Sequence, residues 1–299
     1  MRERVNIHLG LNGDLPTDTT IGKFTSVGMI RSEAVCRKVG AYITDPSCQS
    51  TMISYLREIT NLFQGKQVWY RLIEMETGEI NILKGCDYSV KEKTQMLGLR
   101  GLRRGLTFPN TLEVELSVLA EVYQSHPNLG ILLPYVTNSE EVEKFLELLN
   151  KNGLDRIQLG CMLEIPSICY QIKSLIRLGI TYFVLGLNDL TSLILGSSRS
   201  VNTYNQGNEA VWEFISELVV RVKSFNQTLS IGGYLEAEHL AKASLLGIED
   251  AIIHYHFLGQ TLGGHWRYCP GQISQEDFKK QILLRQKFIE DANRAPCLS

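Results

Sequence analysis

Short runs of apolar residues alternate along the chain with longer stretches that have the period of an α-helix. Several of the short runs, such as GILLPYV at 130–136 and YFVLGL at 182–187, are almost continuously apolar. This pattern is typical of strands that are buried on both faces, as in a parallel sheet. The predicted strands are residues 5–9, 28–31, 67–73, 130–136, 157–164, 182–186, 228–232 and 251–256.

The stretches between these strands predict amphipathic helices. Residues 139–149 place Val142, Phe145 and Leu149 on one face, and acidic residues crowd the first turn after Asn138. Comparable stripes predict helices at 51–63, 111–123, 209–222, 236–246 and 275–293. Eight strands separated by helices favour a closed (β/α)8 TIM barrel, and no linker or repeat interrupts them, so we expect one α/β domain over residues 1–299.

Composition narrows the functional classes. The 299 residues are 44% hydrophobic and 21% charged, which is typical of a folded globular protein, and the net charge of -2 argues against a nucleic-acid partner. No apolar run approaches the roughly 18 residues that a membrane span requires, and the N-terminus has no signal-peptide pattern. The seven cysteines form no Cys-x-x-Cys pair, so we expect reduced thiols in a cytoplasmic protein.

Two acidic residues follow neighbouring predicted strands. In a barrel of this kind, reactive side chains lie at the carboxyl ends of the strands, and Glu164 and Asp189 both fall there. Two carboxylates on adjacent strand ends are natural oxygen ligands for Mg²⁺, which fills its remaining positions with water and substrate oxygens. Each acid alone also has a structural interpretation, since Asp189 could cap a helix that begins at Leu190.

Arginines gather at the same end of the predicted barrel. Arg31 and Arg71 each end an apolar strand, where an unpaired charge would be costly. The interval 74–109, long for a β-to-α connection, carries Arg100 together with Arg103 and Arg104, the last two expected to be solvated. Because the planar guanidinium suits carboxylate and phosphate oxygens, these arginines beside two acids predict a site for a small, doubly acidic ligand.

The same residues carry a family resemblance. The chain resembles the C-terminal barrel of the phosphoenolpyruvate (PEP)-utilising enzymes, which include PEP synthase, pyruvate phosphate dikinase and enzyme I of the sugar phosphotransferase system. The most specific segment is G-x-N-D-L-T at 186–191, with an arginine ten residues beyond the aspartate. The matching segments are VGMIRSE (27–33), VWYRLIE (68–74), MLGLRGLRRGLTFP (96–109), ILLPYV (131–136), CMLEIPSI (161–168), VLGLNDLTSLILGSSRS (184–200) and LSIGGYLEAEHLAKASLLGIEDA (229–251).

The resemblance implies a role for each matched position. Glu164 and Asp189 correspond to the family's Mg²⁺ ligands, and Arg71 corresponds to its supporting arginine on the third strand. The contacts to the phosphate and carboxylate of PEP, or of a pyruvate-like α-keto acid, correspond to Arg31, Arg100, Asn188 and Arg199. Arginines placed this way would neutralise the phosphoryl group during transfer.

The chain departs from the family pattern in two places. Where members have G-x-Cys-Gly-Glu, with Cys as the acid/base toward the enolate, this chain has glycine at 232 and Tyr234 in place of the glutamate. Tyr234, His254 and His256 are candidates to replace the thiol; the two histidines are expected on one face of the last strand, where a packing role is the simpler interpretation. Members also carry phosphohistidine and often ATP-binding domains ahead of the barrel, which implies separate partner proteins here.

Three functions remain open from the sequence. The first is a phosphotransferase subunit of a split PEP-utilising system, which the retained Mg²⁺ and arginine positions favour. The second is an Mg²⁺-dependent C–C lyase or aldolase acting through a pyruvate enolate, which the missing Cys favours and the phosphate-type arginines disfavour. The third is a sensor that binds PEP without turnover. Family members commonly dimerise through this domain, so the resemblance also implies a homodimer.

Overall fold

The fold is a closed barrel of eight parallel strands in sequential order. The computed structural model describes residues 6–16, 24–86, 90–92 and 94–257. Strand β8 pairs with β1, from Asn6↔Asp250 to Leu9↔Ile253, and this pairing closes the barrel. The strands are β1 Asn6–Leu11, β2 Val27–Arg31, β3 Val68–Arg71, β4 Leu129–Leu133, β5 Gln158–Leu163, β6 Ile180–Gly186, β7 Leu229–Gly232 and β8 Asp250–Ile253. All eight predicted strands, and the TIM-barrel architecture, are therefore confirmed.

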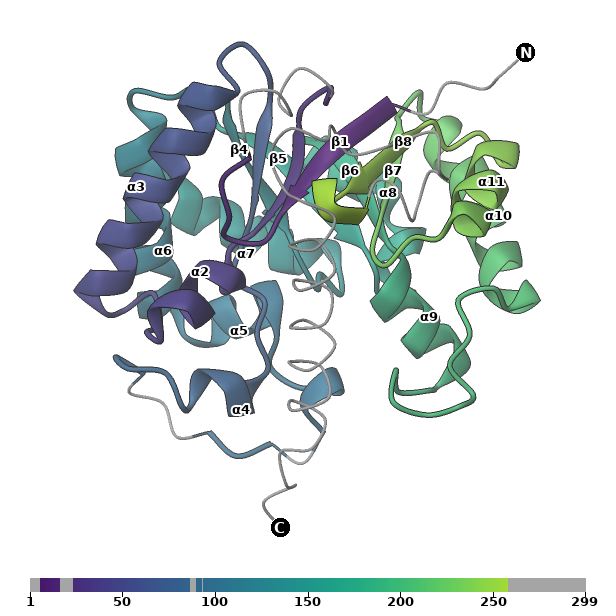
Figure 1. Ribbon diagram of the computed structural model, residues 1–299, viewed down its shortest axis with the longest axis horizontal. Coiled ribbons are helices and arrows are strands. Elements are labelled where there is room, and N and C mark those ends of the chain that lie inside the picture. The colour runs from purple at the N-terminus through teal and green to yellow at the C-terminus, as the bar shows by residue number, and fades with distance from the viewer. Residues whose placement is uncertain (1–5, 17–23, 87–89, 93, 258–299) are drawn as a thin grey trace, which may run out of the picture.

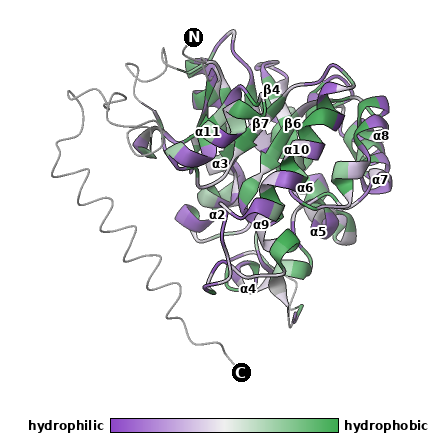
Figure 2. Cartoon of the chain, turned by 90° about the vertical axis from the view of Figure 1, so that its right-hand side faces the viewer, coloured by the Kyte–Doolittle hydropathy of each residue, from purple (hydrophilic) through white to green (hydrophobic). Residues whose placement is uncertain are grey.

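The strands form because their apolar side chains are covered on both faces. One set packs against the surrounding helices, which present green, hydrophobic positions to the strands and purple ones outward in Figure 2. The other set forms one layer across the barrel interior, which we call the inner layer: Met29, Trp69, Leu132, Met162, Val184 and Ile252. Strands β1 and β7 contribute glycines beside it, since a Cβ at Gly10 or at Gly232 would contact Ile252. The inner layer separates the two mouths of the barrel.

Helices surround the barrel (Figure 1). Five of them coincide with predicted helices: α3 Pro46–Leu62, α6 Pro109–Tyr123, α7 Ser139–Lys151, α10 Glu209–Lys223 and α11 Ala237–Leu245. The predicted helix at 275–293 lies outside the described residues. The short helices that the periodicity did not predict are α2 Glu33–Val39, α4 Thr77–Ile80, α5 Gly101–Thr107, α8 Ile172–Arg177 and α9 Leu187–Leu195.

Helix starts follow local capping chemistry. The Asn138 side chain accepts a hydrogen bond from the Glu141 N–H at 3.0 Å and caps α7, as the sequence indicates. Helix α3 begins five residues before its predicted start, because Asp45 caps it through the Ser47 N–H at 2.9 Å and Pro46 occupies its first position. The apolar periodicity marks the buried face of a helix and misses such polar first turns.

The carboxyl ends of the strands carry the longest connections. The interval 74–109 follows β3 and contains α4, a 3₁₀ turn at Gln95–Leu97 and α5. In Figure 1, α4 and α9 lie at the lower side of the molecule, beyond the strands that precede them. One prediction in this region is wrong: Arg104 is buried rather than solvated, and its Nη1 donates to the Thr77 hydroxyl at 2.9 Å.

The described residues are consistent with two further expectations from composition. Cys36, Cys48, Cys86, Cys161 and Cys169 are all free thiols. Within the described ranges, no helix has both the length and the apolar character that crossing a bilayer requires.

One buried acid fixes α6 to β3. The Oε1 atom of Glu115 accepts hydrogen bonds from the Tyr70 hydroxyl and from the Ile73 N–H, both at 2.8 Å. Burial raises the pKa of Glu115 to about 7, although these two hydrogen bonds act in the opposite direction. The carboxyl group is therefore protonated over much of the acidic range in the folded chain, where it is ionised in an unfolded one.

We expect the Glu115 carboxyl group to lower the stability of the protein as pH rises from about 4.3, its unfolded pKa, to about 7. In that window the folded state holds a proton that the unfolded state has lost, so the free energy of unfolding falls, by up to about 3 kcal/mol. Glu115→Gln keeps the accepting oxygen and removes this loss. Urea unfolding at a series of pH values measures the difference between the two proteins.

The control is Glu113→Gln, which changes an exposed glutamate on the same helix. Its stability curve should run parallel to that of the unmodified protein at every pH. If the Glu115→Gln curve also runs parallel to it, the buried-acid account is wrong.

Candidate functional site

Seven charged residues of alternating sign form one chain of ion pairs at the carboxyl mouth of the barrel. We call it the mouth network. It links the ends of β2 and β3, the start of α5, and α9 with the loop after it. In order, its members are Arg31, Glu33, Arg71, Glu74, Arg100, Asp189 and Arg199.

Arg71, the last residue of β3, is the centre of this network. Its Nη2 lies 2.5 Å from Glu33 Oε1 and its Nη1 lies 2.9 Å from Glu74 Oε2, with all three side chains almost fully buried. Burial acts to lower the pKa of Arg71, but the two carboxylates outweigh it and raise the pKa above its usual value. In return, Arg71 and Arg31 overcome the burial of Glu33 and hold its pKa below the usual range. The sequence argument that a charge here must be paired is thus consistent with its contacts.

Arg31, at the end of β2, is placed differently. Its Nε lies 2.9 Å from Glu33 Oε1, but its side chain is 40% exposed. The two strand-end arginines therefore share one carboxylate and differ in burial. Arg31 keeps part of its guanidinium open to solvent at the mouth.

Arg100 enters the mouth because the next residue is glycine. Gly101 has φ +49°, and a Cβ there would lie 2.7 Å from the Pro134 carbonyl oxygen after β4. Arg100 can then pair with Glu74 and approach Asp189 Oδ1 at 3.7 Å, and its guanidinium lies 4.9 Å from the centre of the Tyr135 ring.

Asp189 lies in the first turn of α9, which begins directly after β6 at Leu187. It is therefore inside the helix, and the alternative prediction of a cap for a helix at Leu190 is wrong. Arg199, in the loop after α9, places its Nη2 2.9 Å from Asp189 Oδ1, and the Arg199 side chain is half exposed.

Glu164 stands beside the mouth network without joining it. The residue follows β5, is 1% exposed, and accepts a hydrogen bond at Oε1 from the Tyr135 N–H at 2.7 Å. Gly186 makes room for it, because a Cβ at 186 would lie 2.6 Å from Glu164 Oε2. Burial, with the nearby carboxylates of Glu74 and Asp189, raises the pKa of Glu164 to about 8. Within the described ranges, Glu164 forms no ion pair.

These two acids fit a divalent cation. In the described part of the chain, Glu164 Oε2 and Asp189 Oδ2 make no hydrogen bond or ion pair, while the other oxygen of each is held by an N–H group. Asp189 acts on the pKa of Glu164 as a neighbouring negative charge, so the two carboxylates are close enough to interact. Mg²⁺ prefers one or two carboxylates of this kind. The donor set matches that preference.

Asn188, next to Asp189, connects two loops. Its side-chain oxygen accepts from the Gln206 amide at 2.6 Å and from the Tyr234 N–H at 3.2 Å. Tyr234 itself is exposed, and its ring stands edge-on to Phe257. Gly232 ends β7, and a Cβ there would meet only Val184 and Ile252 at ordinary distances of 3.5 to 3.8 Å. A larger side chain at 232 would therefore enter the barrel between β6 and β8.

The prediction that His254 and His256 lie on the last strand is wrong. Strand β8 ends at Ile253, and Tyr255–Phe257 is a 3₁₀ turn, so the backbone leaves the sheet before His254. The rings of His254 and His256 still stack at 4.9 Å. His254 Nε2 lies 3.1 Å from Asp14 Oδ2, in the loop after β1, and its Nδ1 accepts from the His256 N–H. Asp14 gave no signal in the sequence.

The structure thus brings five of the seven predicted site residues into one network with shared carboxylates, places Glu164 beside it, and ties Asn188 to the neighbouring loops. Glu33 and Glu74 are visible in the sequence as strand-end acids, but their partners are not. Tyr135 was missed. The Tyr135 N–H orients Glu164, and the Tyr135 ring contacts Arg100. The backbone of Tyr135 has a φ of +56°, which is unusual for a residue other than glycine.

Comparisons with known proteins agree on one family. The model of the PEP-binding domain of PEP-utilising enzymes matches residues 3–252. Phosphoenolpyruvate synthase of Pyrococcus furiosus is 28% identical over 222 residues, which cover 69% of this chain and 27% of that protein. A probable phosphoenolpyruvate synthase of Archaeoglobus fulgidus is 31% identical over 185 residues, covering 60% and 25%. The Salmonella typhimurium protein described as "Phosphoenolpyruvate-dependent phosphotransferase system" is 23% identical over 300 residues, covering 95% and 38%.

The chain therefore spans roughly a quarter to two fifths of the length of these relatives. Among solved structures, citrate synthase SbnG superposes with a TM-score of 0.50 at 12% identity, covering 97% of this chain and 95% of that one. At this identity the similarity concerns the fold alone.

Removal of the central arginine should destabilise the protein far more than removal of its exposed neighbour. Arg71→Met leaves Glu33 and Glu74 buried with fewer cations, and we expect the free energy of unfolding to fall by about 3–5 kcal/mol. Arg31→Met removes a half-exposed pair with the same Glu33 carboxylate and should cost about 1 kcal/mol or less. Urea unfolding of both variants at neutral pH compares them. Equal losses would contradict the central role of Arg71.

Proposed function

The chain belongs to the family of PEP-utilising enzymes, whose PEP-binding domain it matches over residues 3–252, and from this premise we propose that its carboxyl mouth binds PEP together with Mg²⁺ for phosphoryl transfer. The observation that carries the proposal is the arrangement at a single mouth of four arginines and of two carboxylate oxygens that have no partner among the described residues. A ligand with a phosphate and a carboxylate needs several planar donors and a cation, and this mouth offers both.

The arginines divide into two roles. Arg31 and Arg199 are 40% and 50% exposed, so their guanidinium groups can reach an entering anion, and Arg100 lies between them in the network. These three contact the phosphate and carboxylate of the ligand. Both Nη atoms of Arg71 pair with buried acids, Glu33 and Glu74, so Arg71 positions the acids that orient its neighbours. Donors fixed before the reaction stabilise charge as it develops without having to reorganise.

Glu164 and Asp189 would hold Mg²⁺. When bound, the ion would supply Lewis-acid stabilisation of negative charge on the ligand oxygens. The Tyr135 N–H holds one oxygen of Glu164, and the Arg199 guanidinium holds one oxygen of Asp189. The second oxygen of each carboxylate then stays available for the ion. Asn188, held by Gln206 and by the Tyr234 N–H, sets the start of α9 and thereby the position of Asp189.

The acceptor of the phosphoryl group is a histidine supplied from outside the described barrel, by a further domain or by a separate phosphohistidine protein that works with a nucleotide-binding protein. The support is the length of the relatives, of which this barrel matches only a part. Transfer breaks the bond between phosphorus and the enol oxygen of PEP, and the pyruvate enolate that leaves takes a proton from solvent, since Gly232 offers none. Incubation of the chain with PEP, Mg²⁺ and a phosphohistidine domain from such a relative would give a phosphorylated domain. If no such domain becomes phosphorylated, the proposed transfer step is wrong.

A second function remains, because Gly232 offers no proton where the family has a thiol. A C–C lyase that acts through a pyruvate enolate does not require that thiol. The four arginines favour a phosphorylated ligand over pyruvate, so transfer stays the preferred function. Binding of PEP without transfer to any domain would favour a sensor.

Loss of either carboxylate should remove Mg²⁺-dependent binding while the barrel stays folded. We expect Glu164→Gln and Asp189→Asn to weaken PEP affinity in the presence of Mg²⁺ by about 100-fold or more, since each removes an oxygen ligand and a negative charge. Asp155→Asn, an exposed acid away from the mouth, should change nothing. Calorimetric titration with PEP, pyruvate and oxalate, each with and without Mg²⁺, gives the affinities.

Unchanged PEP affinity in both variants would refute the metal site. Tight binding of pyruvate with no binding of PEP would instead favour the lyase.

Gly232→Cys should restore an acid/base group at little structural cost. The added Cβ meets Val184 and Ile252 at ordinary distances, so stability should change by about 1 kcal/mol or less. The thiol should accelerate exchange of the pyruvate methyl protons in D₂O with Mg²⁺ by about 100-fold, which is within the range of general acid/base catalysis. Proton NMR follows the loss of the methyl signal. Gly232→Ala is the control, and equal rates in the two variants would contradict the role of this position.

A further inference from the structure

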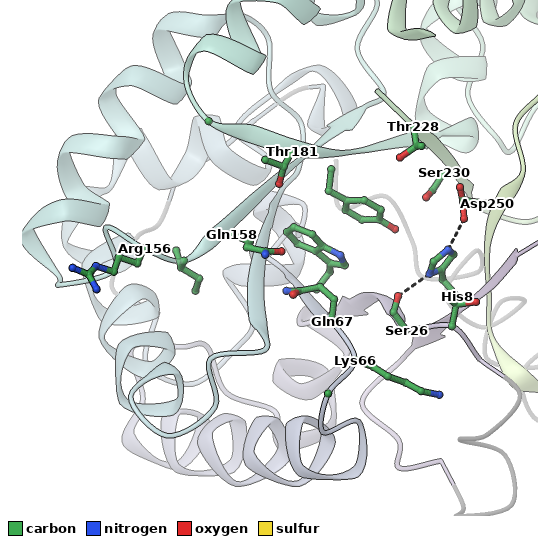
Figure 3. A pocket seen from close by; sticks show the side chains of 16 residues that line it. His8, Ser26, Lys66, Gln67, Arg156, Gln158, Thr181, Thr228, Ser230 and Asp250 are labelled. Atoms are coloured by element: carbon green, nitrogen blue, oxygen red, sulfur yellow. Dashed lines mark hydrogen bonds and ion pairs between the residues drawn. The ribbon is translucent and has the colours of Figure 1, made fainter. Parts of the chain in front are cut away.

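The amino-terminal mouth of the barrel, opposite the mouth network, opens into a cavity of about 790 Å³. Residues at or just before the starts of the strands line it, as Figure 3 shows: His8 of β1, Ser26 before β2, Gln67 before β3, Gln158 of β5, Thr228 before β7 and Asp250 of β8. Cavities of about 300–1,000 Å³ are the usual size of small-molecule sites.

The floor of this cavity is aromatic. The rings of Trp69 and Tyr182 stack at 4.5 Å, nearly parallel, and both border the cavity. Glycines allow this arrangement, because a Cβ at Gly130 would lie 2.7 Å from the Trp69 ring and a Cβ at Gly160 would lie 3.0 Å from Tyr182. The floor belongs to the inner layer and its neighbour Tyr182, so apolar side chains lie between the cavity and the carboxyl mouth.

The walls are mostly polar and uncharged, with Asp250 as the one acidic residue among the lining residues. Hydroxyl and amide groups from six different chain positions face the hollow in Figure 3: Ser26, Gln67, Gln158, Thr181, Thr228 and Ser230. TIM-barrel interiors are ordinarily filled by branched apolar side chains. Polar groups that line an interior must find hydrogen-bond partners, since an unsatisfied one costs about 1–3 kcal/mol. The side-chain nitrogen of Gln67 is buried and has no partner within the described residues.

One hydrogen-bonded chain orders the wall. His8 Nε2 lies 2.8 Å from Asp250 Oδ1, and His8 Nδ1 lies 2.7 Å from the Ser26 hydroxyl (Figure 3). Partial burial acts to raise the pKa of Asp250, but the hydrogen bonds from His8 and Asn6 outweigh it and lower the pKa, so the carboxylate is ionised and can only accept. His8 Nε2 therefore carries a proton. The chain fixes the Ser26 hydroxyl and the His8 ring at the cavity surface.

The two basic residues at the cavity, Lys66 and Arg156, do not face its interior. Figure 3 shows the side chains of Lys66 and Arg156 directed away from the labelled hydroxyl and amide groups. The Lys66 ammonium donates to the Phe24 carbonyl at 2.8 Å, and the Arg156 side chain is 90% exposed. An anion inside would meet the Asp250 carboxylate and no inward cation, which is unfavourable. An apolar molecule would leave the wall groups desolvated without partners.

We propose that this cavity is a second ligand site that binds a neutral, polyhydroxylated molecule of monosaccharide to disaccharide size. Its hydroxyl groups would satisfy the alternating donors and acceptors of the wall, and its C–H groups would pack against Tyr182, the more exposed member of the stacked pair. The site is distinct from the carboxyl mouth and does not depend on the function proposed there.

A panel of defined probes tests the site on the full chain. Glucose, maltose and myo-inositol represent the proposed class, with glucose 6-phosphate as the anionic counterpart and cyclohexanol as the apolar one. Saturation-transfer NMR detects binding and calorimetry gives the dissociation constant. We expect at least one neutral polyol to bind with a dissociation constant of about 1 mM or below, and more tightly than both counterparts.

Two variants locate the binding. Thr181→Trp fills the exposed rim of the cavity and should weaken polyol binding by about 10-fold or more, whereas Thr51→Trp, an equally exposed threonine on α3, should not change it. Gln158→Ala removes one wall amide and should weaken binding by about 5-fold. Glu164→Gln, at the opposite mouth, should leave polyol binding unchanged.

Three results would overturn the proposal: no polyol binding at about 10 mM, tighter binding of glucose 6-phosphate or cyclohexanol, or equal affinity in the Thr181→Trp and Thr51→Trp variants. None of these results bears on PEP binding, so the two proposals fail separately.

Discussion

The carboxyl mouth depends on the pairing of Arg71 with two buried carboxylates. A buried guanidinium is tolerated only when acids compensate it, and acids at that depth are tolerated only when cations compensate them. Glu33 and Glu74 meet this requirement and then extend it, because each also pairs with a second arginine, Arg31 or Arg100. The requirement thus extends from β3 across the mouth as far as Asp189 and Arg199, and it ties together loops that follow different strands.

Glu164 is not part of this balance of charges, because no arginine pairs with it among the described residues. The network supplies four arginines and three acids, and Glu164 adds a fourth acid that has no ion pair among the described residues. An acid that is buried, oriented by the Tyr135 N–H and left beside Asp189 is a poor contributor to stability and a good ligand for a cation. Gly186 and Gly101, which admit Glu164 and Arg100, show how closely the backbone is fitted around these two side chains.

Much of the fold could be predicted from the sequence, because continuous apolar runs require burial on both faces, as in a parallel sheet, and eight such runs separated by helices favour a closed barrel. The strand ends also located most of the charged residues. What could not be predicted is pairing over long range: nothing near Arg104 in the chain indicates its burial against Thr77, and nothing near His254 indicates Asp14. Helices α4 and α8 were missed because they have only 4 and 6 residues, too few for a period to be measured. The polar amino-terminal mouth was missed because its residues lie near strand starts, where polar side chains are expected.

The inner layer has a consequence for how the protein can change. It places apolar side chains between the carboxyl mouth and the His8 chain, and the two sets of polar residues share no hydrogen-bond or ion-pair partner in the part of the chain that the structure describes. Free-energy effects of substitutions add when sites have no partner in common. Substitutions at the two ends should therefore be additive, and a lineage could alter one end of the barrel through many steps without epistatic cost at the other.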